Sequence, residues 1–207
     1  MKIVRLIKNI VLILIIINIL VVGGYFIYLK VSTDEPVEEE VLVVDKIDEF
    51  SYVLDNNKND YYKSLFDELK KVLNNEEVNY EDYAKVISQM FISDLYTLSN
   101  KLSSSDVGGI NFVYQDFQKD FLSIAKTTLY KSVKSNLYGE RVQELPTVTE
   151  VKVDSVTKTT FKNGNTNFEE AYLVKVSITY EKDMGYDKEC ELVLVKKDKL
   201  LEIVKLG

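Results

Sequence analysis

The feature that most constrains this chain is an uninterrupted uncharged run at residues 9–29, NIVLILIIINILVVGGYFIYL. A helix of about 21 residues that rises about 1.5 Å per residue spans the roughly 30 Å hydrocarbon core of a bilayer. After Asn9 at its start, Asn18 is the only strongly polar residue in the run, so such a helix is apolar on every side and lipid is its simplest solvent. The sequence therefore predicts a transmembrane anchor at residues 9–29, with the lipid bilayer as its partner.

The charges that flank the run predict its orientation. The cations that precede it are Lys2, Arg5 and Lys8. The segment after it, KVSTDEPVEEE, is mainly acidic. Because Lys/Arg-rich flanks stay on the cytoplasmic side, we expect residues 1–8 to be a cytoplasmic tail and the C-terminal domain to lie outside the cell membrane. Pro36 and the mutually repelling glutamates favour an extended acidic stalk at residues 30–45.

Two other interpretations of the run are weaker than an anchor. A cleaved signal peptide has an apolar stretch of about 7–15 residues and a small-residue cleavage site. This run is longer and ends in bulky residues, and Gly23 and Gly24 are the only small residues near its end. A core helix of a soluble protein would need other elements to cover it on all sides. The anchor therefore stays the first expectation.

The rest of the chain is long enough for one exported domain, residues 46–207. About 160 residues can bury a substantial core. The net charge of −7 argues against a nucleic-acid partner, because binding to phosphates requires clustered Lys and Arg.

Cys190 is the only cysteine, so it has no internal disulfide partner. We expect it to be a small buried side chain on a strand, with an intermolecular link as the alternative.

Three amphipathic helices are predicted in the first part of the domain, at about residues 59–135. The first, at residues 59–75, has apolar residues at i, i+3, i+4 and i+7 and a cap at Asn59 or Asp60. The second, at residues 79–102, begins after an Asn79 cap with acidic residues in its first turn. A serine-rich loop precedes the third helix, which is expected around residues 114–133.

A sheet is predicted in the second part of the domain, at about residues 147–206. Its four strands are expected at residues 148–160, 169–180, 188–196 and 200–206. The second strand alternates apolar and polar residues most regularly, and a phase shift after Val153 in the first strand predicts a bulge. Asn163-Gly164 is a strong turn signal between the first two strands. An earlier strand is predicted around Phe50 to Leu54, and the VLVV segment at residues 41–44 is a further short candidate.

Helices first and an antiparallel meander last indicate an α+β fold, with about three helices packed on a curved antiparallel sheet of four to five strands. This order, behind a short tail and a single anchor, resembles the cone-shaped roll of the nuclear-transport-factor-like (cystatin-like) superfamily. The tethered form is similar to single-pass scaffold subunits of bacterial conjugation and type IV secretion systems. The resemblance covers residues 46–206 in architecture alone. It implies a concave pocket between helices and sheet, and it supports the fold more than the role.

Several kinds of site are absent from the sequence. The chain has no histidine, which excludes Ser-His-Asp and Cys-His catalysis and imidazole zinc sites. It has no glycine-rich phosphate loop, and we expect neither a cofactor nor a metal. The string Asp55, Asn57, Asn59 begins like a calcium loop but continues with Asp60 where a glycine is required. We therefore expect a polar turn that caps a helix.

Four side chains form a speculative pocket, namely Asp94, Tyr83, Tyr96 and Tyr114. Asp94 lies in an otherwise apolar stretch, where partial burial would raise its pKa. We favour the other explanation, an Asp at the edge of a helix that is paired with a nearby lysine. Tyrosines at helical spacing are more often core or pocket lining than reacting groups.

The expected function is therefore not catalytic. We expect a membrane-anchored extracytoplasmic interaction or scaffold domain in a bacterial cell-envelope assembly, which binds a protein partner or a second copy of itself. The alternative is a domain that binds a small molecule or a cell-wall fragment in the concave pocket. An enzyme that uses Asp94 and tyrosines is the third hypothesis.

Overall fold

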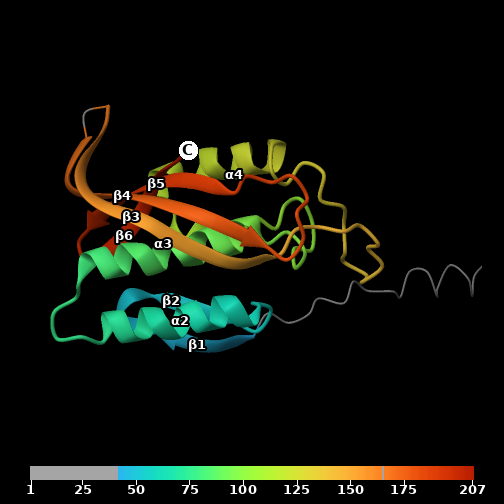
Figure 1. The fold of residues 1–207 in the computed structure, drawn as a ribbon, viewed down its shortest axis with the longest axis horizontal. Helices are drawn as coiled ribbons and strands as arrows, with labels where there is room; N and C mark the ends of the chain where they lie inside the picture. Colours follow the sequence, from blue (N-terminus) through green and yellow to red (C-terminus); the bar gives the residue numbers. More distant parts are fainter. Residues whose placement is uncertain (1–41, 165) are drawn as a thin grey trace, which may run out of the picture. The chain divides into compact units, whose positions relative to one another are not determined.

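A four-stranded antiparallel sheet in the order β3-β4-β5-β6 forms the C-terminal part of the protein (Figure 1). Its strands are β3 (Val148–Asn163), β4 (Thr166–Tyr180), β5 (Glu189–Lys197) and β6 (Leu200–Leu206). All four strands were predicted, and their ends differ from the prediction by at most three residues. The meander and the α+β class are therefore confirmed.

This computed structural model describes residues 42–164 and 166–207. The predicted tail and anchor and most of the predicted stalk lie outside the described residues. Within the described ranges, no helix has both the length and the apolar character that crossing a bilayer requires.

The sheet follows the sequence pattern closely. In β4, Tyr172, Val174, Val176 and Ile178 are all buried on one face, as their alternation predicts. The pairing of β3 with β4 shifts register between Val153 and Ser155, which confirms the predicted bulge. Gly164 adopts a positive φ of 56° between the two strands, a conformation that glycine tolerates without steric cost.

Within residues 42–164, three α-helices precede the sheet, and two of them start at the predicted caps. The helices are α2 (Asp60–Leu73), α3 (Tyr80–Tyr96) and α4 (Gln118–Thr127). The Asn59 Oδ1 accepts a hydrogen bond of 2.8 Å from the Tyr62 N–H. The Asn79 Oδ1 accepts one of 3.0 Å from the Glu81 N–H. Both side chains satisfy amide groups that the first helical turn leaves unpaired.

The second and third helices are shorter than predicted. α3 ends at Tyr96 instead of residue 102, because the backbone N–H groups of Leu98 and Ser99 donate to the Pro146 carbonyl. α4 covers only the centre of the predicted third helix. Its predicted first turn is replaced by the 3₁₀ segment η3 (Gln115–Phe117), and another 3₁₀ segment, η2 (Ile110–Phe112), precedes it. Tyr114 lies between the two segments and donates its N–H to Ile203 of β6. Tertiary hydrogen bonds therefore override the helical pattern at both places.

The N-terminal strands form a separate two-stranded sheet. β1 (Val43–Ile47) pairs antiparallel with β2 (Tyr52–Asp55), and η1 (Asp48–Phe50) connects them. β1 begins within the last residues of the predicted stalk. The predicted strand at Phe50 to Leu54 is wrong at its start, because Ser51 adopts a positive φ of 57° and turns the chain. The domain thus has sheets of four and two strands instead of one sheet of four to five.

The core lies where α3 packs on the sheet. α3 contacts β3 and β4, and α2 packs on α3; Figure 1 shows α3 between the sheet and α2. α3 and α2 therefore form a second and a third layer, whereas the sequence predicted that all the helices pack on the sheet directly. Cys190 of β5 is partly buried beside this core as a free thiol.

Candidate functional site

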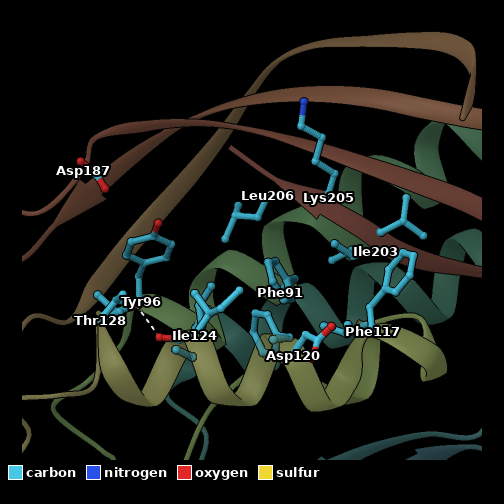
Figure 2. Close-up of a pocket in the computed structure, with 16 residues that line it drawn as sticks. Phe91, Tyr96, Phe117, Asp120, Ile124, Thr128, Asp187, Ile203, Lys205 and Leu206 are labelled. Carbon is cyan, nitrogen blue, oxygen red and sulfur yellow. Dashed lines mark hydrogen bonds between the residues drawn. The ribbon is translucent and has the colours of Figure 1, made fainter. Parts of the chain in front are cut away.

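An apolar groove of about 470 Å³ lies between α3, α4 and β6. The side chains that give it its character are Phe91, Leu95, Phe117, Phe121, Ile124 and Leu206. We call this surface the apolar groove. Figure 2 shows Phe91, Ile124 and Leu206 converging on the space between β6 and α4. A concave pocket between helices and sheet, which the resemblance implied, is therefore present.

The groove is lined by residues of α3, α4 and β6. The rings of Phe91 on α3 and Phe121 on α4 pack with their centroids 5.8 Å apart, which joins the two helices at the base of the groove. Further along α4, Ile124 is 62% exposed. Because this side chain adjoins the other apolar side chains of the groove, it extends a contiguous apolar surface. The wall is therefore suited to contact an apolar partner.

Few polar groups surround the groove. Asp120, Asp187 and Lys205 contribute to its rim, and in Figure 2 the Lys205 side chain extends away from α4. Tyr96 stands at one end of the groove. Its burial, together with Cys190 and Asp187 nearby, raises the pKa of Tyr96 to about 12. Tyr96 is therefore neutral at physiological pH and can donate a hydrogen bond.

A second, polar cavity of about 260 Å³ lies beside Asp94. The Lys58 Nζ and the Lys101 Nζ both donate to the Asp94 Oδ1 at 2.7 Å. The Gly109 N–H donates to the other carboxylate oxygen at 2.9 Å. This geometry depends on a close approach of the loop, because a Cβ on Gly108 would lie 2.1 Å from the Asp94 carbonyl oxygen.

These contacts determine the protonation state of Asp94. Burial by itself raises the pKa of the carboxyl, but the two ammonium groups and their hydrogen bonds lower it well below its usual range. A rise in the pKa of Asp94 is therefore wrong, and the favoured explanation, a lysine-paired carboxylate, is confirmed. A carboxylate held so firmly in its charged form is a weak base, so this arrangement does not favour proton abstraction by Asp94.

The structure separates the four residues of the speculative pocket. Asp94 lines the polar cavity and Tyr96 lines the apolar groove. Tyr83 is fully buried, with its hydroxyl 2.6 Å from the hydroxyl of Tyr52. Tyr114 packs its ring against Phe168, with centroids 5.5 Å apart, and lines neither cavity. The predicted grouping is therefore wrong, although two of its members lie at cavities.

Sequence reasoning missed Lys58, Lys101 and Glu202. Lys58 is 36 residues from Asp94, and no local pattern connects two such distant positions. Lys101 follows Asp94 by seven residues, a spacing that two helical turns bring to one face, but α3 ends before it. Glu202 lines the polar cavity with its Oε2 buried and without a hydrogen bond among the described residues, and burial raises its pKa.

The calcium-like string Asp55, Asn57, Asn59 runs from the end of β2 through the turn that leads into α2. Asn59 caps α2, which confirms the polar turn expected in place of a calcium loop. Residues 42–164 and 166–207 contain no group of three or more Cys, Asp or Glu placed to hold a metal ion.

The chain was also compared with known proteins. No protein-family model matches it, and neither a curated protein nor a solved structure gives a significant match. The fold and the two cavities therefore define the candidate site by themselves, as an α+β domain with an apolar groove along its sheet edge and a separate polar cavity.

Proposed function

We propose that this chain is a single-pass membrane protein whose exported domain binds a protein partner in the bacterial cell envelope, and that the apolar groove is the surface which the partner contacts. The observation that carries this proposal is the groove itself. Its volume of about 470 Å³ lies in the range of established binding pockets, roughly 300–1,000 Å³. Its walls are aromatic and aliphatic, with a few polar groups at the rim, as is typical of binding sites.

The membrane anchor is the second part of the proposal. Residues 9–29 would cross the bilayer with residues 1–8 in the cytoplasm, as the length of the run and the basic flank favour. The acidic stalk would then hold residues 46–207 on the outer side. The order of helices and sheet supports a further proposal, that this domain is a variant of the nuclear-transport-factor-like roll, with a scaffold role similar to that of the tethered secretion subunits.

Binding is a better explanation of the cavities than catalysis. Asp94, the acid at the polar cavity, is held ionised by two lysines. Tyr96, the hydroxyl at the apolar groove, has its pKa raised to about 12 and does not ionise near pH 7. Neither group has a pKa near the working pH, where general acid–base catalysis is efficient.

A second candidate uses the same groove for a small apolar molecule or the lipid-like part of a cell-wall fragment. The observation that favours it is the size of the groove, which suits a small ligand as well as a few side chains of a protein. The nature of the occupant distinguishes the two candidates.

Site-specific photo-crosslinking in intact cells tests the proposal. Ile124, in the groove, and Val142, 97% exposed and outside it, would each be replaced by p-benzoylphenylalanine in the full-length chain. We expect the label at position 124 to give a discrete protein adduct in the membrane fraction, and the label at position 142 to give none. An adduct of small mass would favour the second candidate. Equal adducts at both positions, or none at position 124, would refute a role for the groove.

A further inference from the structure

The edge of β6 is open where it borders the apolar groove. The Glu191 N–H donates to the Gly207 carbonyl at 2.7 Å, and the Gly207 N–H donates to the Glu191 carbonyl at 2.9 Å. In an antiparallel ladder, the residue next to such a pair points its own N–H and C=O away from the partner strand. Leu206, which is opposite Leu192, therefore directs both backbone groups away from β5. Among the described residues, neither group meets a hydrogen-bond partner on that side.

The same edge already accepts a backbone segment further upstream. The Tyr114 N–H donates to the Ile203 carbonyl at 2.9 Å, and Val113 pairs with Ile203 in parallel orientation. After Tyr114 the chain turns into η3 and α4, so this contact is not continued along residues 204–207. The edge of β6 is thus occupied at its centre and free at its end.

The free edge and the apolar groove form one continuous surface. Leu206 contributes its side chain to the groove as well as its outward backbone groups, and Figure 2 shows that side chain directed toward α4. A strand beside β6 would place alternate side chains on one face, where Phe91 and Ile124 offer apolar contacts. Main-chain hydrogen bonds at an edge combined with side-chain pockets define recognition by strand addition.

We infer that the partner enters the groove as an extended peptide segment that adds a fifth strand beside β6 and inserts alternate apolar side chains between β6 and α4. This inference rests on the proposed function and specifies its partner. The free edge of four residues, 204–207, is about 13 Å long at about 3.3 Å per residue, so it pairs with a segment of about four residues. Asp120 and Asp187 outnumber Lys205 at the rim, which favours a segment with basic flanks.

The test compares two substitutions of one residue in the full chain, reconstituted in lipid nanodiscs. Leu206→Ala removes the apolar side chain and keeps the N–H, whereas Leu206→Pro removes the outward N–H as well. Because that N–H does not bond to β5, the proline breaks no hydrogen bond within the sheet. The probes are fluorescent peptides Lys-X-Thr-X-Thr-Lys with X as Val, Leu or Phe, measured by anisotropy.

We expect at least one probe to bind, and Leu206→Pro to bind it about tenfold more weakly than Leu206→Ala, since the donor is lost and the ring obstructs the incoming strand. Matching thermal midpoints for the two variants would show that both are folded. Equal affinities of the two folded variants, or the absence of binding by every probe up to about 1 mM, would overturn the inference.

N-methylation of the peptide provides a second measurement that does not depend on the protein variant. In an extended peptide, alternate amides face β6. Methylation of an amide that faces β6 is expected to weaken binding about tenfold, whereas methylation of an amide that faces away is expected to leave binding nearly unchanged. Equal effects at all amides would also reject strand addition. If methylation had equal effects at all amides but a protein adduct still formed at position 124 in cells, strand addition would be rejected and the proposed function would stand. The failure of this inference can therefore be distinguished from the failure of the proposed function.

Discussion

Lys101 and Asp94 form an ion pair in which both side chains are almost completely buried, with 4% and 9% of their surfaces exposed and 2.7 Å between Nζ and Oδ1. Lys58 shares the same carboxylate oxygen. The cluster links the start of α2, the end of α3 and the loop at Gly108 and Gly109. Such an arrangement is highly sensitive to the removal of one partner, because the remaining charges stay buried.

Replacement of Asp94 by Asn is expected to destabilise the domain by about 3 kcal/mol, since it leaves two ammonium groups without their counter-charge. Urea unfolding of the full chain in detergent, followed by circular dichroism, measures the change. Asp48→Asn is the matched control, because its pair with Lys46 is exposed on both sides, and it should give no measurable effect. A similar midpoint for Asp94→Asn and the wild type would contradict the prediction.

The same carboxylate predicts a loss of stability in acid. The pKa of Asp94 is lower in the folded protein than its usual value, so the unfolded chain binds more protons in the interval between the two values. The stabilisation is therefore complete above about pH 4, the unfolded pKa, and is lost as the pH falls below it. Thermal midpoints between about pH 5 and pH 2 should fall less steeply in Asp94→Asn than in the wild type.

Glu202 is expected to have the opposite pH dependence. Burial raises its folded pKa, so the folded state holds the proton more tightly than the unfolded state. The stabilisation that Glu202 provides is greatest below its unfolded pKa of about 4.3, and it declines as the pH rises through its folded pKa. Glu202→Gln should flatten this decline, whereas Glu140→Gln, at an exposed position, should not. A wild-type slope retained in Glu202→Gln would show that another group is responsible.

Ile124→Asp should abolish partner binding without unfolding the domain. The side chain is 62% exposed, so the substitution introduces a charge at the groove wall with little effect on the core. We expect at least a tenfold loss of binding of the hexapeptide probes, because a desolvated carboxylate opposes an apolar contact. Val142→Asp is the control. Equal binding by the two variants would show that the probes occupy a different surface.

Much of the fold follows from short-range patterns. The alternation in β4 identifies the strand and its buried face, because each of those side chains needs only to be on one side of a sheet. Asn59 and Asn79 mark helix starts because a short polar side chain there satisfies amides two or three residues away. In both cases the decisive interaction lies within a few residues, so the sequence alone predicts it.

The parts that were missed depend on distant partners. α3 ends early because of the Pro146 carbonyl, about 50 residues later in the chain, and the first turn of the predicted third helix gives way to a bond with β6. Asp94 was recognised as an unusual acid, but its protonation depends on Lys101 and Lys58, which lie after α3 and before α2. The tyrosines shared a helical pattern without sharing a cavity, because that pattern indicates burial and not which neighbours a side chain has.

The solitary thiol on β5 has a practical consequence for all of these experiments. Burial, with Asp187 nearby, raises the pKa of Cys190 to about 12, so hardly any of the reactive thiolate exists at neutral pH. A cysteine engineered at an exposed position would therefore react with maleimide reagents far faster than the native one. Spin labels or fluorophores for distance measurements on the intact protein can thus be attached selectively, without first replacing the natural residue.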